Sequence, residues 1–261
     1  MYRSWLVALS LLAGCDAVFG LGEPDDRDAG VIVPGDDGAP VDVPDLEDGG
    51  APTPDAPAPL VCGLNDFSAD LTGWATAQTG ACTQERCVLA ISNGAATVKL
   101  GAAGGLNSTL NPSVDFDGGS VAIEAIPGTT ASSTSQLRVA MSASETLGIG
   151  ISMDSVRNPT LVVTRTSAGI TTTTMPTPYN AVAHRHWQIA HVAGTAAGAE
   201  LVVSTRATSV AGWTELTRVS APADVSTTFA QLDVSRTTST IDADPAGNIV
   251  VSFDNFILCG R

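Results

Sequence analysis

The stretch Leu147-Gly148-Ile149-Gly150-Ile151-Ser152-Met153 alternates large apolar residues with small ones. Because successive side chains of a β-strand point to opposite faces, its large residues would share one buried face. The same period of two recurs between clusters of Gly, Pro, Asn and Ser, at residues 121–125, 137–141, 161–163, 201–203 and 249–253. No window combines the period of a helix with helix caps. The pattern therefore predicts an all-β fold of about a dozen strands in two antiparallel sheets.

The strand-forming segments lie within residues 61–261, which we expect to form a single β-sandwich domain. A segment of about 200 residues can enclose one hydrophobic core. This part of the chain has ten basic and fifteen acidic residues, a net charge of −5, and Lys99 is its only lysine. Since it lacks a basic cluster, the composition argues against nucleic acid as a partner.

The N-terminus is a short segment with one positive charge and an apolar run that ends at a cysteine. Residues 1–14 combine one positive charge with a short apolar run and small residues, as secretory signals do. The run leads into Leu12-Ala13-Gly14-Cys15, which resembles the lipobox, whose cysteine is lipidated after cleavage. The resemblance implies a lipid anchor on Cys15 and a place in the cell envelope, at the outer membrane or cell surface. Asp16, directly after the cysteine, is also compatible with retention at the inner membrane. The alternative to a lipid-anchored protein is an ordinary secreted protein.

Residues 15–60, rich in Asp, Pro, Gly and Ala, have the composition of a tether. They hold twelve of the 27 acidic residues and one of the 12 basic ones, which gives them a net charge of −11. A segment with low hydrophobicity and high net charge buries too little apolar surface to offset its ordering entropy. We therefore expect a disordered spacer between the lipid anchor and the β-domain.

Four cysteines follow Cys15, at positions 62, 82, 87 and 259. An even number in an exported chain favours disulfides, and four cysteines allow three pairings. Cys62 and Cys259 bracket the domain, while Cys82 and Cys87 enclose only four residues. We therefore prefer the pairs 62–259 and 82–87. A zinc site is not expected, because the short Cys82–Cys87 spacing has no matching second pair.

Short motifs of the domain follow one another in a recognisable order: Asp66-Phe67 and Trp74, Arg185-His186-Trp187, Gly212-Trp213-Thr214 and Phe253-Asp254-Asn255-Phe256. They resemble those of the concanavalin A-like (laminin-G-like) jelly rolls of bacterial surface proteins. The resemblance implies a two-sheet antiparallel jelly-roll sandwich that binds carbohydrate or protein in some members. By strand alternation, Trp187 and Ile189 should be core residues, and Trp213 should pack with Phe253 from a neighbouring strand.

Tyr179 and Asn180 are the candidate ligand-binding residues. A sugar site usually pairs an exposed aromatic ring with polar neighbours, and these two residues end the Pro-rich loop at 176–180. A Tyr179 ring packed against the sandwich is the alternative. No cofactor is expected, although a structural calcium at Asp115, Asp117 or Asp254 is conceivable without any clear motif for it.

Catalytic motifs are hard to find in the sequence. Glycosidases need two carboxylates that flank the scissile bond, but Glu124 has no acidic residue two positions away. Asp115 and Asp117 adjoin a glycine pair, so they suggest a turn at a strand end. His184 and His186 would share a strand face, yet no acid or cysteine adjoins them in sequence to complete a metal site. We therefore expect a chain that is not an enzyme.

Together these features predict a lipid-anchored envelope protein that displays a non-catalytic β-sandwich. Its partners would be the membrane, through the anchor, and a glycan or another envelope protein. Two alternatives stay open: a structural envelope protein without a specific small ligand, and a polysaccharide-degrading enzyme.

If Cys15 carries the lipid, the Cys15→Ser variant should lose incorporation of a labelled fatty acid and move from the membrane fraction to the soluble fraction. The measurement is metabolic labelling followed by fractionation of cells expressing the full chain. Cys15→Ser protein that keeps both the label and the membrane location would contradict the prediction.

Overall fold

The computed structural model describes residues 59–65, 67, 70–195, 198–237 and 249–261. All of them belong to one compact unit, Pro54–Arg261. The predicted signal peptide, Cys15 and almost all of the predicted tether lie outside the described residues. No helix long and apolar enough to cross a membrane occurs within the described ranges.

Sheet A has eight strands, all paired antiparallel. Seven of them lie in the order β13 (Thr214–Ser220), β12 (Gly198–Arg206), β11 (His186–Thr195), β6 (Ser120–Pro127), β15 (Ile249–Gly260), β4 (Ala95–Leu100) and β3 (Cys87–Ser92). The eighth strand, β1 (Val61–Asn65), also pairs with β15.

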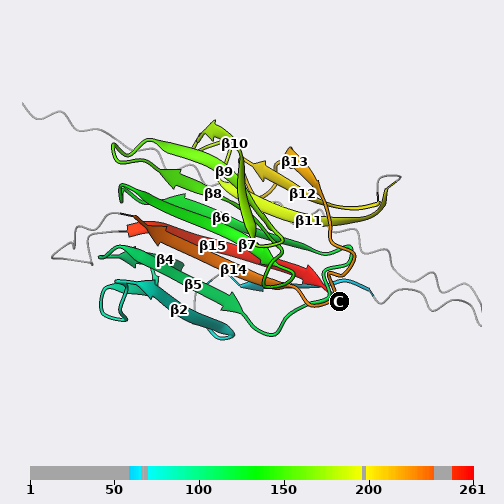
Figure 1. The fold of residues 1–261 in the computed structure, drawn as a ribbon, viewed down its shortest axis with the longest axis horizontal. Coiled ribbons are helices and arrows are strands. Elements are labelled where there is room, and N and C mark those ends of the chain that lie inside the picture. Colours follow the sequence, from blue (N-terminus) through cyan, green and yellow to red (C-terminus); the bar gives the residue numbers. More distant parts are fainter. Residues whose placement is uncertain (1–58, 66, 68–69, 196–197, 238–248) are drawn as a thin grey trace, which may run out of the picture. The chain divides into compact units, whose positions relative to one another are not determined.

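Sheet B has seven antiparallel strands, in the order β10 (Ile170–Pro178), β9 (Pro159–Ser167), β8 (Thr146–Met153), β7 (Ser133–Ala140), β14 (Phe229–Arg236), β5 (Gly104–Leu110) and β2 (Trp74–Gly80). The fold is thus a two-sheet antiparallel jelly-roll sandwich, as predicted (Figure 1). The described residues contain fifteen strands rather than about a dozen. The predicted count is low because strands such as β2 and β5 consist mainly of Gly, Ala, Thr and Ser, without alternating large apolar residues.

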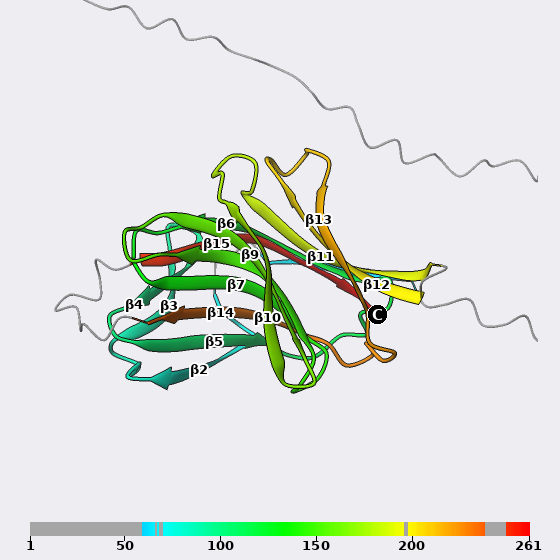
Figure 2. The same cartoon turned by 45° about the horizontal axis from the view of Figure 1, so that its top comes forward.

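The core lies between the two sheets, and alternation decides which residues enter it. In β8 the large residues Leu147, Ile149 and Ile151 are buried on the inner face, as the period of two predicts. In Figure 2, β14, β5 and β2 of sheet B lie below β6 and β15 of sheet A. Trp187 fills the space between the sheets, with its ring edge-on to Phe253 at a centroid distance of 6.4 Å.

The prediction that Trp213 packs with Phe253 is wrong. Trp187 holds that position, whereas Trp213 lies half-buried just before β13, where its ring contacts Arg206 instead. The sequence pattern misleads here because Trp213 precedes the strand, so the alternation of β13 does not determine which way its side chain points.

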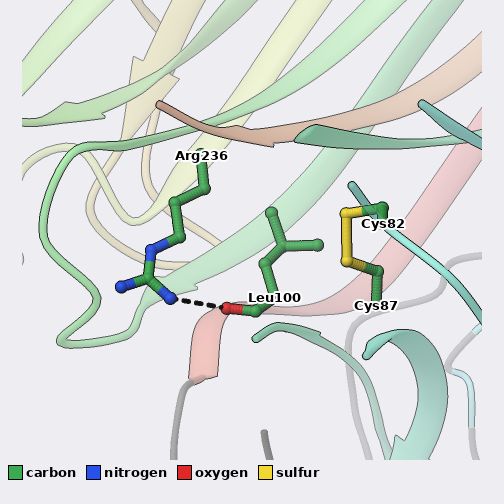
Figure 3. Close-up of a disulfide and its surroundings, with 4 residues drawn as sticks. All are labelled: Cys82, Cys87, Leu100 and Arg236. Carbon is green, nitrogen blue, oxygen red and sulfur yellow. Dashed lines mark hydrogen bonds between the residues drawn. A yellow bond between two sulfur atoms is a disulfide. The ribbon is translucent and has the colours of Figure 1, made fainter. Parts of the chain in front are cut away.

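Two disulfides fasten the domain, in the pairing that the sequence favours. Cys62–Cys259 joins the registered strands β1 and β15 across 197 residues of chain. Cys82–Cys87, separated by five positions in sequence, closes a short loop of four intervening residues that leads into β3. Figure 3 shows this second bond beside Leu100, whose carbonyl oxygen accepts a hydrogen bond from Arg236 Nη1 at 3.0 Å. The first disulfide therefore fixes the ends of the domain, and the second fixes a local turn.

Removal of the two disulfides should affect stability unequally. In the chain-entropy description, closure of the 197-residue loop contributes up to about 5 kcal/mol and closure of the short Cys82–Cys87 loop about 2 kcal/mol. Denaturant titration should therefore find the Cys62→Ser/Cys259→Ser protein less stable than the Cys82→Ser/Cys87→Ser protein. Equal losses would contradict this reasoning.

Candidate functional site

Four ionisable residues form a row across the outer face of sheet A. Strand register places Arg206 of β12 beside His186 of β11, and His186 beside Glu124 of β6. Glu124 in turn lies beside Asp254 of β15. At the usual spacing between strands the row spans roughly 14 Å. We call these four residues the ionisable row.

Alternation explains why these residues face outward. Ile123 and Ala125, the neighbours of Glu124 in β6, are buried in the core, and so is Trp187, the neighbour of His186. A strand that buries every second residue must turn the residues between them to the opposite face. The ionisable row is therefore fixed by the packing of the sandwich.

Glu124 is the most enclosed acid of the row, with 8% of its surface exposed. Its two carboxylate oxygens accept hydrogen bonds from Arg185 Nε at 2.6 Å and from Asn255 Nδ2 at 2.8 Å. Burial raises the pKa of Glu124, but the hydrogen bonds from Asn255 and Arg185 and the charge of Arg185 outweigh it and hold the pKa below its usual value. Glu124 is therefore a fixed, ionised carboxylate at neutral pH.

A β-bulge brings Asn255 to Glu124. The register between β15 and β6 shifts between Asp254 and Ile257, and Asn255 has a left-handed φ of 50°. Because of this extra residue, Phe253 and Phe256 both point into the core while the residues between them reach the outer face. The Phe-Asp-Asn-Phe motif thus encodes a bulge that presents an amide to the carboxylate.

The histidines near this site have different surroundings. His186 has only 6% of its surface exposed. Burial and the charges of Arg206 and Arg185 lower the pKa of His186, against the opposing effect of Glu124, so the ring is neutral at pH 7. His184 was expected on the same strand face, but it precedes β11 and accepts a hydrogen bond from the Asn180 N–H at 3.0 Å. That expectation is therefore wrong.

Arg206 and Trp213 form the other end of the site. The Arg206 guanidinium carbon lies 4.1 Å from the centroid of the Trp213 ring, a cation–π contact. Both side chains are half-buried, and burial lowers the pKa of Arg206, which stays protonated. The contact holds a flat cation and an indole together at the end of the ionisable row.

An open groove of about 410 Å³ lies over part of the ionisable row. Its polar lining is Glu124, Arg185, His186 and Asn255, and two loops, at 181–182 and 207–209, form its sides. A smaller hollow of about 210 Å³ shares His186 and Asn255 with it and extends to Arg206 and Trp213. We call the two together the row groove.

Tyr179 and Asn180 lie just outside the lining of the row groove. The Tyr179 ring is half-buried against the core and tilted toward His184, and burial raises its pKa to about 12. Asn180 Oδ1 accepts hydrogen bonds from the N–H groups of Val182 and Ala183, so its side chain shapes the loop beside the groove. A direct role for either residue in ligand binding stays a prediction.

Asp115 and Asp117 lie elsewhere, in a turn beside the C-terminus. Asp115 Oδ1 accepts the Asp117 N–H, and Asp117 pairs with Arg261, both at 3.0 Å. His191 Nδ1 lies 3.3 Å from Asp117 Oδ1 and accepts the Gly118 N–H at 3.0 Å. Throughout the described ranges no three His, Cys, Asp or Glu side chains group to hold a metal ion, and a calcium site stays untested.

The outer face of sheet B offers a contrasting surface. Strand β8 turns Gly148 and Gly150 outward, and a Cβ at Gly148 would lie 2.8 Å from Cγ of Arg138. Arg138 thus extends over the strand, where it pairs with Asp233 and donates to Thr146 at 2.8 Å. Gln136 lies beside it and accepts from Thr164 at 3.2 Å. The charged groups of this face are therefore bound to one another.

Comparison with known proteins supports the fold. No family model matches the sequence, and no curated protein matches it. A glycosyl hydrolase family protein from Mycobacterium fortuitum is similar in structure, with a TM-score of 0.51 and 12% identity over 76% of this chain and 98% of that chain. A prokaryotic β-1,3-1,4-glucanase (lichenase) from a mouse hindgut metagenome has a TM-score of 0.50 and 9% identity over 77% of this chain and 99% of that one. The fold is the concanavalin A-like jelly roll.

These similarities correct one expectation from the sequence. We expected a chain that is not an enzyme, whereas several solved structures with this fold are glycoside hydrolases. At identities of 8% to 12% they show the fold alone. The absence of a familiar carboxylate motif is therefore no reason to exclude catalysis. The prediction that the chain is not an enzyme is corrected accordingly.

The sequence analysis missed the convergence of Glu124, Arg185 and Asn255, because each comes from a different segment of the chain. The available signal was the position of each residue beside a core residue, as in Ile123-Glu124-Ala125 and Arg185-His186-Trp187. Polar residues that interrupt strongly apolar strands occupy an outer face, but their register across the sheet cannot be read from one sequence.

The lowered pKa of Glu124 has a consequence for acid stability. A carboxyl whose folded pKa lies below its unfolded value stabilises the fold above that unfolded value, and loses this effect as the pH falls through the folded pKa. Glu124→Gln should therefore cost about 1–2 kcal/mol at pH 7. By pH 3 this cost should shrink. Urea titrations at both pH values test it, with Glu85→Gln as an exposed control; a cost that does not change with pH would contradict it.

Proposed function

We propose that the β-domain binds a glycan in the row groove. The observation that carries this proposal is the convergence of Glu124, Arg185 and Asn255, from three distant segments, on an open groove bordered by Trp213. Each of these polar groups is held in place by the core or by its neighbours. A rigid set of hydrogen-bonding groups loses little entropy when a ligand binds.

The chemistry of the groove suits a sugar. The fixed carboxylate of Glu124, beside the donors of Arg185, can exchange hydrogen bonds with hydroxyl groups. An indole such as that of Trp213 offers apolar area with a polar edge, which suits the mixed surface of a pyranose ring. The open shape would admit part of a polymer better than a small enclosed metabolite.

We further propose that a lipid on Cys15 anchors the chain in the cell envelope and that residues 16–60 hold the domain away from the membrane. The lipobox resemblance and the acidic, Pro-rich composition support this arrangement. A glycan bound in the row groove would then be an envelope or extracellular polymer.

Trp213→Ala should weaken binding to a polysaccharide by roughly tenfold, and Glu124→Gln by a similar factor, since each removes a fixed contact of the groove. The measurement is affinity electrophoresis of the full chain, purified in detergent with its disulfides formed, through gels containing one polysaccharide each. Tyr179→Ala serves as the matched aromatic variant outside the groove, and the melting temperature of every variant is checked.

A loss confined to Tyr179→Ala would move the site to the loop at 176–180 and contradict the row groove. Retardation by none of the polysaccharides would overturn glycan binding altogether. The same samples are assayed for released reducing ends, because the fold also occurs in glycoside hydrolases. Release that disappears in Glu124→Gln and Asp254→Asn would make the groove a hydrolytic site.

A further inference from the structure

The charged groups of the row groove are not all paired. Glu124, its most enclosed acid, is already paired with Arg185 and Asn255. No carboxylate among the described residues pairs with Arg206, whose contact is with the Trp213 ring. The nearest acid on β13, Glu215, is bound by Arg218 through two hydrogen bonds of 2.7 Å each. The end of the groove at Arg206 therefore carries a positive charge that no described carboxylate pairs with.

Arg206 is also arranged to receive an anion. Its Nε is buried and closed to a ligand, which leaves the two terminal nitrogens as the groups that an anion can reach. The contact with Trp213 orients the guanidinium plane, so its two terminal nitrogens are held in place before a ligand arrives. A partly desolvated guanidinium binds a carboxylate more strongly than an exposed one, because fewer waters screen the pair. Neutral His186, the cross-strand partner, does not compete for the anion.

We propose that the row groove binds an acidic polysaccharide, with the carboxylate of a uronic acid residue against the Arg206 guanidinium. This inference rests on the proposed glycan binding and specifies its ligand class. The planar carboxylate of a uronate matches the two terminal N–H groups of the guanidinium in a bidentate pair. The neighbouring sugar hydroxyls then reach the fixed carboxylate of Glu124. A domain with a net charge of −5 attracts no polyanion at long range, so the anion must be bound locally.

The test compares each acidic ligand with its own uncharged form. Fluorescent oligogalacturonate and oligoalginate, and the methyl esters of both, are titrated into the full chain in detergent. We expect the free acids to bind at least tenfold more tightly than the esters. Arg206→Gln should remove this preference, and Arg206→Lys should restore only part of it. Arg165→Gln is the matched control, because it removes the same charge from β9 of sheet B, outside the row groove, where Arg165 donates a hydrogen bond to the Ser220 carbonyl of β13.

The outcomes separate the two proposals. Equal binding of acids and esters, unchanged by Arg206→Gln, would overturn the uronate inference and leave glycan binding standing. Binding of dextran sulfate but of no uronate would also overturn it, in favour of sulfate esters. Failure of every charged and neutral polysaccharide to bind would overturn the proposed function and this inference together. Since Arg206 lies at a groove edge, unchanged melting temperatures for its variants are required for any loss to count.

Discussion

A carboxylate enclosed on the surface of a sheet must find its hydrogen-bond donors within the protein, and Glu124 imposes this constraint on three strands. Its donors come from the segment before β11 and from the bulge of β15, which lie 61 and 131 residues away in sequence. Both must arrive in register, because a shift of one residue would turn each donor to the opposite face. The central strands of sheet A are therefore tied together by one ionised group.

The bulge in β15 shows how the core and the site depend on each other. The two phenylalanines that flank the bulge fill the core, where Phe253 contacts Trp187 and Phe256 contacts Trp74. If the strand were regular, only one of them could face inward, since alternation would turn the other outward. The extra residue satisfies the packing and presents Asn255 to Glu124. The same short motif therefore sets both the packing of the two phenylalanines in the core and the hydrogen bond from Asn255 to Glu124.

The fold could be predicted because alternation is strong in the central strands, where large apolar residues such as Leu147 and Ile149 must face the core. The edge and near-edge strands rich in Gly and Thr, among them β2 and β5, are formed through their neighbours, so their sequences alone carry a weak signal. The site could be predicted only in parts. The Arg-His-Trp and Phe-Asp-Asn-Phe motifs were found, but their meeting at Glu124 depends on strand order. The packing of Trp213 was predicted wrongly, because this residue precedes β13 and the alternation of that strand does not determine the direction of its side chain.

The charged side chains on one outer face of the sandwich are paired, whereas on the other face one of them is not. This difference determines on which face a charged ligand would gain more binding free energy. On sheet B, Arg138 already binds Asp233 and Thr146, so a ligand would have to replace existing bonds. On sheet A the guanidinium of Arg206 contacts the Trp213 ring and makes no hydrogen bond or ion pair with the described residues, so an incoming anion adds a bond without breaking one. Displacing a formed charge pair cancels most of the free energy that a new one supplies. Unsatisfied, oriented charge is therefore the reason to place the proposed binding site on sheet A.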